Sequence, residues 1–298
     1  MNTTFWGPSG WQFLHTLTFI YPENPSFNDK VKMQEFMNSL CFILPCKYCR
    51  LSFTKYISSL PINDYLDSRT TMIEWLYKIH NKVNNKLRKQ GFCNHSNPEL
   101  SEVIKHYEPI ITNIYRLLNN KNKNETTRIK DTVNYMCNLG SNFLGSIVFN
   151  YQGYFTNCHT SNEKIRIVTV YNSFFNSIIT MIISFLDKFG KFGYYAVKCS
   201  KEKQDMINKK FNIRNILMQN EPYTKLVKWF YKCDDLCTME EIYTTEEKYE
   251  NHFNKHIVMS CDNPIASKNN KTCRNTVTKN RRTKSSFTKK KSIKSLNI

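Results

Sequence analysis

Two cysteines separated by two residues are the sharpest chemical feature of the sequence. Cys46 and Cys49 follow Pro45, and proline is favoured in the first turn of a helix. The pair is therefore expected at the start of a helix, where two sulfurs so closely spaced can form a disulfide bond. The positive end of the helix dipole stabilises a thiolate there, lowers its pKa and makes it reactive. This pattern favours a redox-active pair.

The same spacing also suits a zinc site, which needs two further ligands. Candidates lie nearby at Cys41, Cys93 and His95, and further along the chain at the pair Cys233 and Cys237. Because the Cys-x-x-Cys spacing alone serves both chemistries, it leaves both interpretations open. A zinc-stapled protein that binds nucleic acid through a basic tail is therefore the alternative to a redox enzyme.

The composition favours a folded, helix-rich chain with a basic tail. The 298 residues are 40% hydrophobic, enough for one large domain or two ordinary ones, and only 8 Gly and 9 Pro argue against a many-stranded β fold. The net charge of +19 is concentrated at residues 264–298, which hold eleven Lys or Arg and no Asp or Glu. Such a tail is expected to be disordered, and two interpretations stay open: contact with nucleic acid or an acidic surface, and a solvated tail with no dedicated partner.

The apolar spacing predicts an all-α fold in two parts. Over residues 1–118 it predicts four helices and a short fifth helix from Pro98 to about Leu118. Residues 119–127 are polar and aperiodic and are expected to form a linker. A second, mostly helical domain of unassigned role is predicted over residues 128–260, followed by the basic flexible tail at 261–298.

No targeting or membrane-spanning segment is expected. The N-terminus lacks the basic and apolar regions of a signal peptide, and the longest apolar stretch, residues 177–186, is far shorter than the roughly 20 residues that span a bilayer. The sequence thus predicts a soluble protein that is not secreted through a signal peptide. Eleven cysteines are unusual in such a protein, so metal or redox chemistry should account for some of them.

Two helical stripes of aromatic, histidine and amide residues accompany the cysteine pair. Trp11 and His15 share one helix face, while His80, Asn84 and Leu87 share another. Each stripe alone is more typical of core packing than of a ligand site. In combination with the cysteines, four motifs stand in order: Trp6 to His15, Tyr21-Pro22, Pro45 to Arg50, and Trp75 to Leu87. Together they resemble the ERV/ALR family of flavin-dependent sulfhydryl oxidases over about residues 5–118.

The resemblance implies a four-helix bundle with a short fifth helix that holds FAD non-covalently and no metal. By motif position, the residues expected to contact FAD are Gly7, Trp11, His15, Tyr21, Cys49, Trp75, His80, Asn81, Val83, Asn84, Lys86 and Leu87. Aromatic and aliphatic side chains would cover the flat rings, and amides and histidines would supply directional hydrogen bonds. Lys86 would offer a cation to the diphosphate.

The resemblance also implies a route for electrons. A substrate thiolate would attack Cys46, taken as the more exposed sulfur of a Cys46–Cys49 disulfide, and release Cys49 against the flavin. Two electrons would pass to FAD and then to O₂, giving hydrogen peroxide. The family usually feeds its site through a second, flexible cysteine pair. The candidates for this shuttle are Cys261 with Cys273, and Cys233 with Cys237.

The partners implied by the resemblance are protein dithiols, O₂ and a second copy of the chain in a homodimer. An oxidase domain followed by an extra helical domain, in an Asn-, Lys-, Ile- and Tyr-rich chain, is similar to the two-domain enzymes of large DNA viruses. This similarity implies oxidation of viral proteins in the host cytoplasm, with the virion as a second location. The disulfide partner of Cys93 stays unassigned.

Overall fold

The computed structural model describes residues 3–92, 94–156, 160–190 and 251–253, and these ranges contain helices and no strand. In chain order the elements are α1 (Thr3–Ile20), α2 (Phe27–Ile43), α3 (Lys47–Ser59), the 3-10 helix η1 (Ile62–Tyr65), α4 (Arg69–Lys89), α5 (Leu100–Leu118), α6 (Glu125–Leu139), α7 (Ser141–Thr156) and α8 (Ser161–Gly190). The predicted all-α class is confirmed. The predicted basic tail lies outside the described residues.

Several helix boundaries differ from those that the sequence predicts. Helix α5 (Leu100–Leu118) begins two residues later than expected and ends at the expected residue. Helix α6 begins at Glu125, inside the segment expected to be a linker, because Asn124 caps it. The Asn124 side chain accepts a hydrogen bond of 2.8 Å from the backbone N–H of Thr127. The division of the chain at residues 119–127 stays a prediction.

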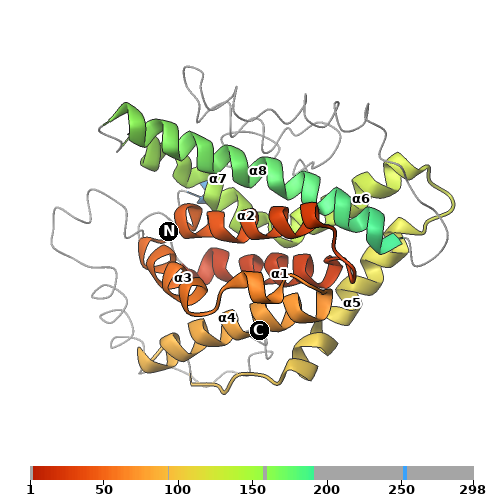
Figure 1. The fold of residues 1–298 in the computed structure, drawn as a ribbon, viewed down its shortest axis with the longest axis horizontal. Helices are drawn as coiled ribbons and strands as arrows, with labels where there is room; N and C mark the ends of the chain where they lie inside the picture. Colours follow the sequence, from red (N-terminus) through yellow and green to blue (C-terminus); the bar gives the residue numbers. More distant parts are fainter. Residues whose placement is uncertain (1–2, 93, 157–159, 191–250, 254–298) are drawn as a thin grey trace.

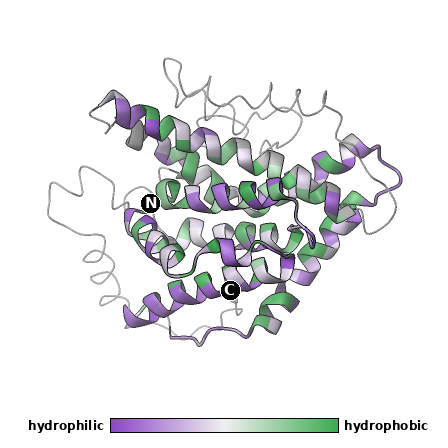
Figure 2. Cartoon of the chain, in the orientation of Figure 1, coloured by the Kyte–Doolittle hydropathy of each residue, from purple (hydrophilic) through white to green (hydrophobic). Residues whose placement is uncertain are grey.

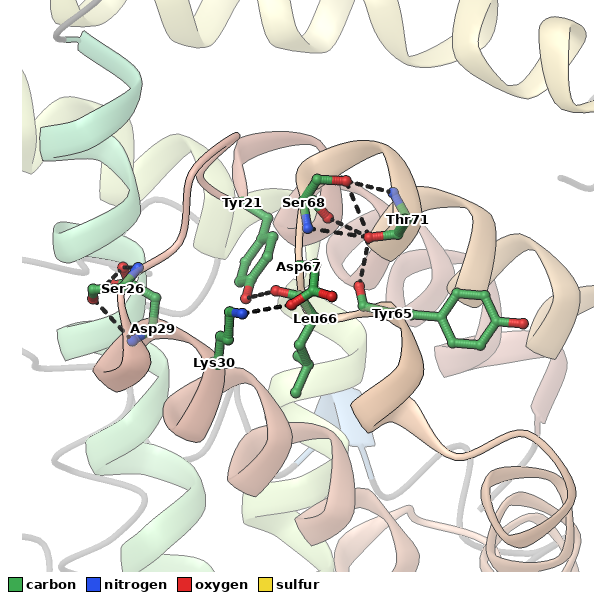
Figure 3. Close-up of polar contacts among 9 residues, drawn as sticks. All are labelled: Tyr21, Ser26, Asp29, Lys30, Tyr65, Leu66, Asp67, Ser68 and Thr71. Carbon is green, nitrogen blue, oxygen red and sulfur yellow. Dashed lines mark hydrogen bonds and ion pairs between the residues drawn. The ribbon is translucent and has the colours of Figure 1, made fainter.

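Two capping boxes fix where α2 and α4 begin. At α2, Ser26 Oγ accepts from the Asp29 N–H while the Asp29 carboxylate accepts from the Ser26 N–H. At α4, Ser68 and Thr71 exchange the same two kinds of hydrogen bond. The two boxes lie on either side of Tyr21, which follows α1 (Figure 3). The start of α2 and the start of α4 are thus held close to the end of α1.

Helices α7 and α8 cover the face of the bundle formed by α1 and α2. Helix α8 runs alongside α2, and α7 packs against α1 (Figure 1). The rings of Phe36 of α2 and Phe174 of α8 stack with centroids 5.2 Å apart, and the ring centroids of Phe143 of α7 and Trp6 of α1 are 5.9 Å apart. Most buried apolar side chains of α1 to α4 and of α6 to α8 belong to one continuous core. A second, smaller cluster joins Phe19 of α1 and Ile73 of α4 to Val103 and Tyr107 of α5.

A glycine allows the corner between α6 and α7 to approach α1. A Cβ atom added to Gly140 would lie 2.8 Å from Cδ2 of Phe13, a residue with no exposed surface. Any larger residue at this corner would have to displace the Phe13 ring or the helix backbone. Gly140 therefore permits the close contact through which the covering helices reach the core.

Every helix mixes hydrophilic and hydrophobic residues along its length (Figure 2). None of the helices in the described ranges combines the length with the apolar character that crossing a bilayer would require. The arrangement is that of amphipathic helices around a shared interior.

Candidate redox and cofactor site

The Cys-x-x-Cys pair lies at the start of α3, as the sequence predicts. Cys46 is the N-cap residue, with an extended backbone at φ −127° and ψ 123°, and Cys49 lies in the first turn. The Cys46 carbonyl accepts hydrogen bonds of 3.0 Å from the N–H groups of Cys49 and Arg50. Both sulfurs are free thiols in this structure. The helix start therefore presents a reduced cysteine pair.

The two thiols of the pair differ in acidity because a hydrogen bond joins their side chains. A hydrogen bond from the Cys49 thiol, reinforced by the backbone N–H groups of Cys49 and Tyr48, lowers the pKa of Cys46 to about 6. The same hydrogen bond and burial raise the pKa of Cys49 well above its usual value, while the charge of Lys86 opposes that rise. At neutral pH the reduced pair is thus a Cys46 thiolate bound to a Cys49 thiol.

The exposure of the two whole residues follows a different order from that of their thiol groups. Cys46 is 6% exposed, whereas Cys49 is partly exposed. Cys46 is more enclosed because it and its neighbours Leu44 and Pro45 are all buried at the junction between α2 and α3. Protein surrounds the Cys49 thiol more completely than the Cys46 thiol, so the expectation that Cys46 carries the more exposed sulfur stays a prediction.

A second cluster joins α1 to α4 through two buried histidines. His15 Nε2 and His80 Nδ1 lie 3.1 Å apart, and the Trp11 indole stacks on the His80 ring at 3.7 Å between centroids and 10° between planes. Burial lowers the pKa of His80 to about 3, and burial together with the nearby His80 and His106 lowers the pKa of His15. Both imidazoles are therefore neutral at physiological pH, so one donates to the other.

One nitrogen of this cluster is left without a protein partner. His15 Nδ1 is buried and makes no hydrogen bond. A buried polar atom without a partner is costly and commonly marks a place where a ligand or water completes the site. The ring of Tyr107 of α5 packs against the His15 ring with centroids 5.1 Å apart, and the Tyr107 hydroxyl donates a hydrogen bond of 3.5 Å to the Trp11 carbonyl. Tyr107 was not predicted as a site residue, because its spacing with Val103 indicates only a buried helix face.

The second half of α4 links the histidine cluster to the cysteine pair. Lys86 Nζ donates a hydrogen bond of 2.5 Å to Ser52 Oγ of α3, and its charge acts on Cys49. The other predicted ligands on this half of α4 are partly exposed side chains, namely Asn81, Val83, Asn84 and Leu87. Accessible side chains of α4 therefore extend from the Trp11–His80 stack towards the redox pair.

Comparison with known proteins places this geometry in a family. Residues 8–106 match the family model described as Erv1 / Alr family. A probable FAD-linked sulfhydryl oxidase of Acanthamoeba polyphaga mimivirus is 38% identical over 85 residues, which are 28% of this chain and 59% of that protein. Residues 8–106 form an Erv1/Alr domain.

Two further relatives support the same assignment. The mitochondrial FAD-linked sulfhydryl oxidase ERV1 of Saccharomyces cerevisiae is 40% identical over 90 residues, which are 30% of this chain and 46% of that protein. An FAD-linked sulfhydryl oxidase of African swine fever virus is 28% identical over 85 residues, or 28% of this chain and 70% of the viral protein. The chain thus spans about half the length of the first two relatives.

Three of the predicted FAD contacts lie apart from the histidine cluster. Tyr21 is fully buried and donates to the Leu66 carbonyl at 2.9 Å, as Figure 3 shows. Trp75 is fully buried, and its indole N–H donates to the Leu60 carbonyl at 3.0 Å. Gly7 is partly exposed, with open space where a side chain would stand. These contacts help to hold the Erv1/Alr domain together, and a role towards FAD stays a prediction for all three.

The other cysteines are divided between described and undescribed parts of the chain. Cys41 is a free thiol buried in α2, and Cys137 of α6 is disulfide-bonded. Cys93 and the proposed shuttle residues lie outside the described residues, namely Cys233, Cys237, Cys261 and Cys273. Within the described ranges, no group of three or more His, Cys, Asp or Glu is placed to hold a metal ion.

Proposed function

We propose that the chain is a flavin-dependent thiol oxidase that forms disulfide bonds in protein substrates. The match of residues 8–106 to the Erv1/Alr family and the names of the viral and yeast relatives support this activity. Within the chain, the observation that carries the proposal is the Cys46–Cys49 pair at the start of α3, where hydrogen bonds lower the pKa of Cys46 and the charge of Lys86 acts on Cys49.

The residues around the histidine cluster fit the proposed cofactor. The buried Nδ1 atom of His15 makes no hydrogen bond within the protein, so it can form one with a ligand atom. Trp11 offers a flat aromatic surface beside it. Together with Cys49, Lys86 and the side chains of α4, these residues would hold FAD. Bound FAD would accept two electrons from the cysteine pair and pass them to O₂, which is reduced to hydrogen peroxide.

The proposed exchange uses both sulfurs of the pair in turn. A substrate thiolate attacks Cys46 of the oxidised pair, and the S–S bond breaks to release Cys49 as a thiolate near Lys86. A second substrate thiolate then attacks the substrate sulfur bound to Cys46. The substrate leaves as a disulfide, and two electrons and the accompanying protons remain on the pair.

The low pKa of Cys46 assists the second of these steps. In that step Cys46 is the leaving group, and thiols of lower pKa leave faster. The hydrogen bonds that lower its pKa come from Cys49 and from the first turn of α3. The helix start therefore favours release of the oxidised substrate rather than accumulation of the mixed disulfide.

Flavin content tests the cofactor part of the proposal. The purified chain should absorb as a flavoprotein, and His80→Ala should lower the ratio of flavin to protein because it removes the stacking partner of Trp11 and the hydrogen-bond partner of His15. Added FAD should raise the melting temperature of the wild-type chain more than that of the variant, because a ligand stabilises only the fold that binds it.

A matched histidine substitution provides the control. His95 lies on the same domain and is exposed, and only its backbone carbonyl is bonded to Arg88. The flavin ratio of His95→Ala should equal that of the wild-type chain. A colourless wild-type protein that gains no stability from FAD would contradict the proposed cofactor.

The viral relatives also support a proposed setting for the activity. Sulfhydryl oxidases of a mimivirus, of African swine fever virus and of an invertebrate iridescent virus match the domain. We therefore propose that the chain oxidises viral proteins in the host cytoplasm. The homodimer, the location in the virion and the contact of the basic tail with nucleic acid or an acidic surface stay predictions.

A further inference from the structure

The surface beside the redox pair has an unusual charge distribution. No Asp or Glu occurs over residues 36–63, which contain α3, or over residues 75–98, which contain most of α4. The same two stretches hold eight cationic residues, namely Lys47, Arg50, Lys55, Lys78, Lys82, Lys86, Arg88 and Lys89. The surface that surrounds the cysteine pair is therefore built from two segments that carry positive charge only.

Helix geometry gathers these charges along the junction of α3 and α4. Lys78, Lys82, Lys86 and Lys89 follow each other at intervals of three or four residues, so they share one face of α4. Lys86 on that face bonds to Ser52 of α3, whereas Lys78 pairs with Glu74 and bonds to the Tyr65 hydroxyl of η1. The end of α4 that carries these residues is strongly hydrophilic (Figure 2).

The exposed face of α3 combines cations with apolar side chains. Lys47, Leu51 and Lys55 are exposed and stand four residues apart, so they form one row along the helix. Leu51 is 61% exposed, and Tyr48 beside it is 36% exposed. A protein thiol that reaches the first turn of α3 comes close to Lys47 and Tyr48, because these two residues stand between Cys46 and Cys49.

The cations of this face are available to a partner. The ion pairs within the described part of the chain involve none of Lys47, Lys55, Lys82 and Lys89. Unpaired cations around an exchange site attract acidic segments and raise their association rate, and they also stabilise an incoming thiolate. This surface should therefore increase the association rate of acidic substrates and also favour ionisation of their thiols.

We propose that the face formed by Lys47, Tyr48, Leu51 and Lys55, flanked by the lysine row of α4, is a docking surface for a protein dithiol whose cysteines are flanked by acidic residues. The proposal rests on the proposed oxidase function and adds the class of substrate. The acidic side chains contact Lys47 and Lys55 of α3 and Lys82 and Lys89 of α4, while an apolar residue near the cysteine packs on Leu51.

Oxygen consumption by the full chain with three dithiols tests the proposal. The dithiols are dithiothreitol, a Cys-x-x-Cys peptide flanked by aspartates, and the same peptide flanked by lysines. At low ionic strength kcat/KM for the aspartate peptide should exceed that for the lysine peptide by roughly five- to tenfold. The ratio should approach one at high salt, since exposed charges are screened.

A charge-reversal variant and its matched control locate the effect. Lys55→Glu should reduce the preference for the aspartate peptide by about threefold and leave dithiothreitol turnover unchanged. Lys105→Glu changes the net charge equally at an exposed position on α5 and should leave the preference intact. Equal rates with the two peptides, or an unaltered preference in Lys55→Glu, would overturn the docking surface while leaving the oxidase function in place. Absence of turnover with dithiothreitol would overturn the oxidase function and this inference with it.

Discussion

Helices α1 to α5 bury a pair of histidines that touch each other and a cysteine pair that shares a proton. Helices α6 to α8 bury mainly aromatic and aliphatic side chains, and the buried polar residues among their described positions are Thr132, Ser146 and Ser177. Titratable groups cluster in the first region, whereas the second supplies apolar cover for α1 and α2. The difference indicates that chemistry and stability are divided between two regions that share one interior.

Removing a covering aromatic residue should separate these two contributions. Phe174→Ala deletes a fully buried ring that stacks on Phe36, and the resulting cavity should lower the free energy of unfolding by about 3–5 kcal/mol. Turnover with dithiothreitol should be unchanged at temperatures where the variant is folded. Chemical denaturation and oxygen consumption measure the two effects.

An exposed phenylalanine gives the comparison. Phe27 is 82% exposed, and Phe27→Ala should change the free energy of unfolding by less than about 0.5 kcal/mol. If Phe174→Ala lost activity while remaining folded, the covering helices would belong to the chemistry, and the division between the regions would be wrong.

Acid should destabilise the protein through the histidine pair. The pKa values of His15 and His80 are lowered in the folded chain, to about 3 for His80, so protons bind preferentially to the unfolded chain. The free energy of unfolding should therefore be highest above about pH 6.5, the ordinary histidine pKa. Below that pH, each histidine should lower it by up to about 1.4 kcal/mol per pH unit. Denaturation between pH 6.5 and 4.5 measures this slope.

Substituting one member of the pair should reduce that slope. His80→Gln keeps a hydrogen-bonding side chain and removes one titrating group, so its unfolding free energy should vary less with pH than that of the wild-type chain. Identical slopes for the two proteins would mean that His80 is not held neutral in the folded state.

The acidity of Cys46 should depend on its partner. Alkylation of Cys46 in the reduced chain, followed by peptide mass spectrometry across pH, should report a pKa of about 6. Cys49→Ala removes the thiol donor and should raise that pKa by about one unit or more, since a hydrogen bond to a charged group stabilises it by about 1.5–3 kcal/mol.

The hydroxyl of Cys49→Ser can still donate to the Cys46 thiolate, so this variant should retain most of the lowered pKa. If the alanine and serine variants gave the same Cys46 pKa, the first turn of α3 alone would account for the acidity.

Local sequence predicted much of the redox region. Pro45 indicated the start of α3, and the spacing of Trp11 and His15 placed both on one face of α1, where the structure finds them against His80. These predictions succeeded because helix periodicity and proline preferences act within a few residues. The capping box of Ser26 and Asp29 was equally readable from sequence.

Contacts between distant segments could not be predicted in this way. Asp29 pairs with Lys188 of α8, and Tyr107 packs on His15, although long stretches of chain separate the partners. Periodicity marks a face as buried without identifying what covers it.

Oxygen consumption by the full chain with dithiothreitol is the most direct test of the central claim that Cys46 and Cys49 are the redox pair of a flavin-dependent thiol oxidase. The wild-type chain should consume oxygen, Cys46→Ser and Cys49→Ser should each abolish turnover while keeping bound flavin, and Cys41→Ala, which removes a nearby buried free thiol, should remain active. Undiminished turnover in either serine variant would contradict the account.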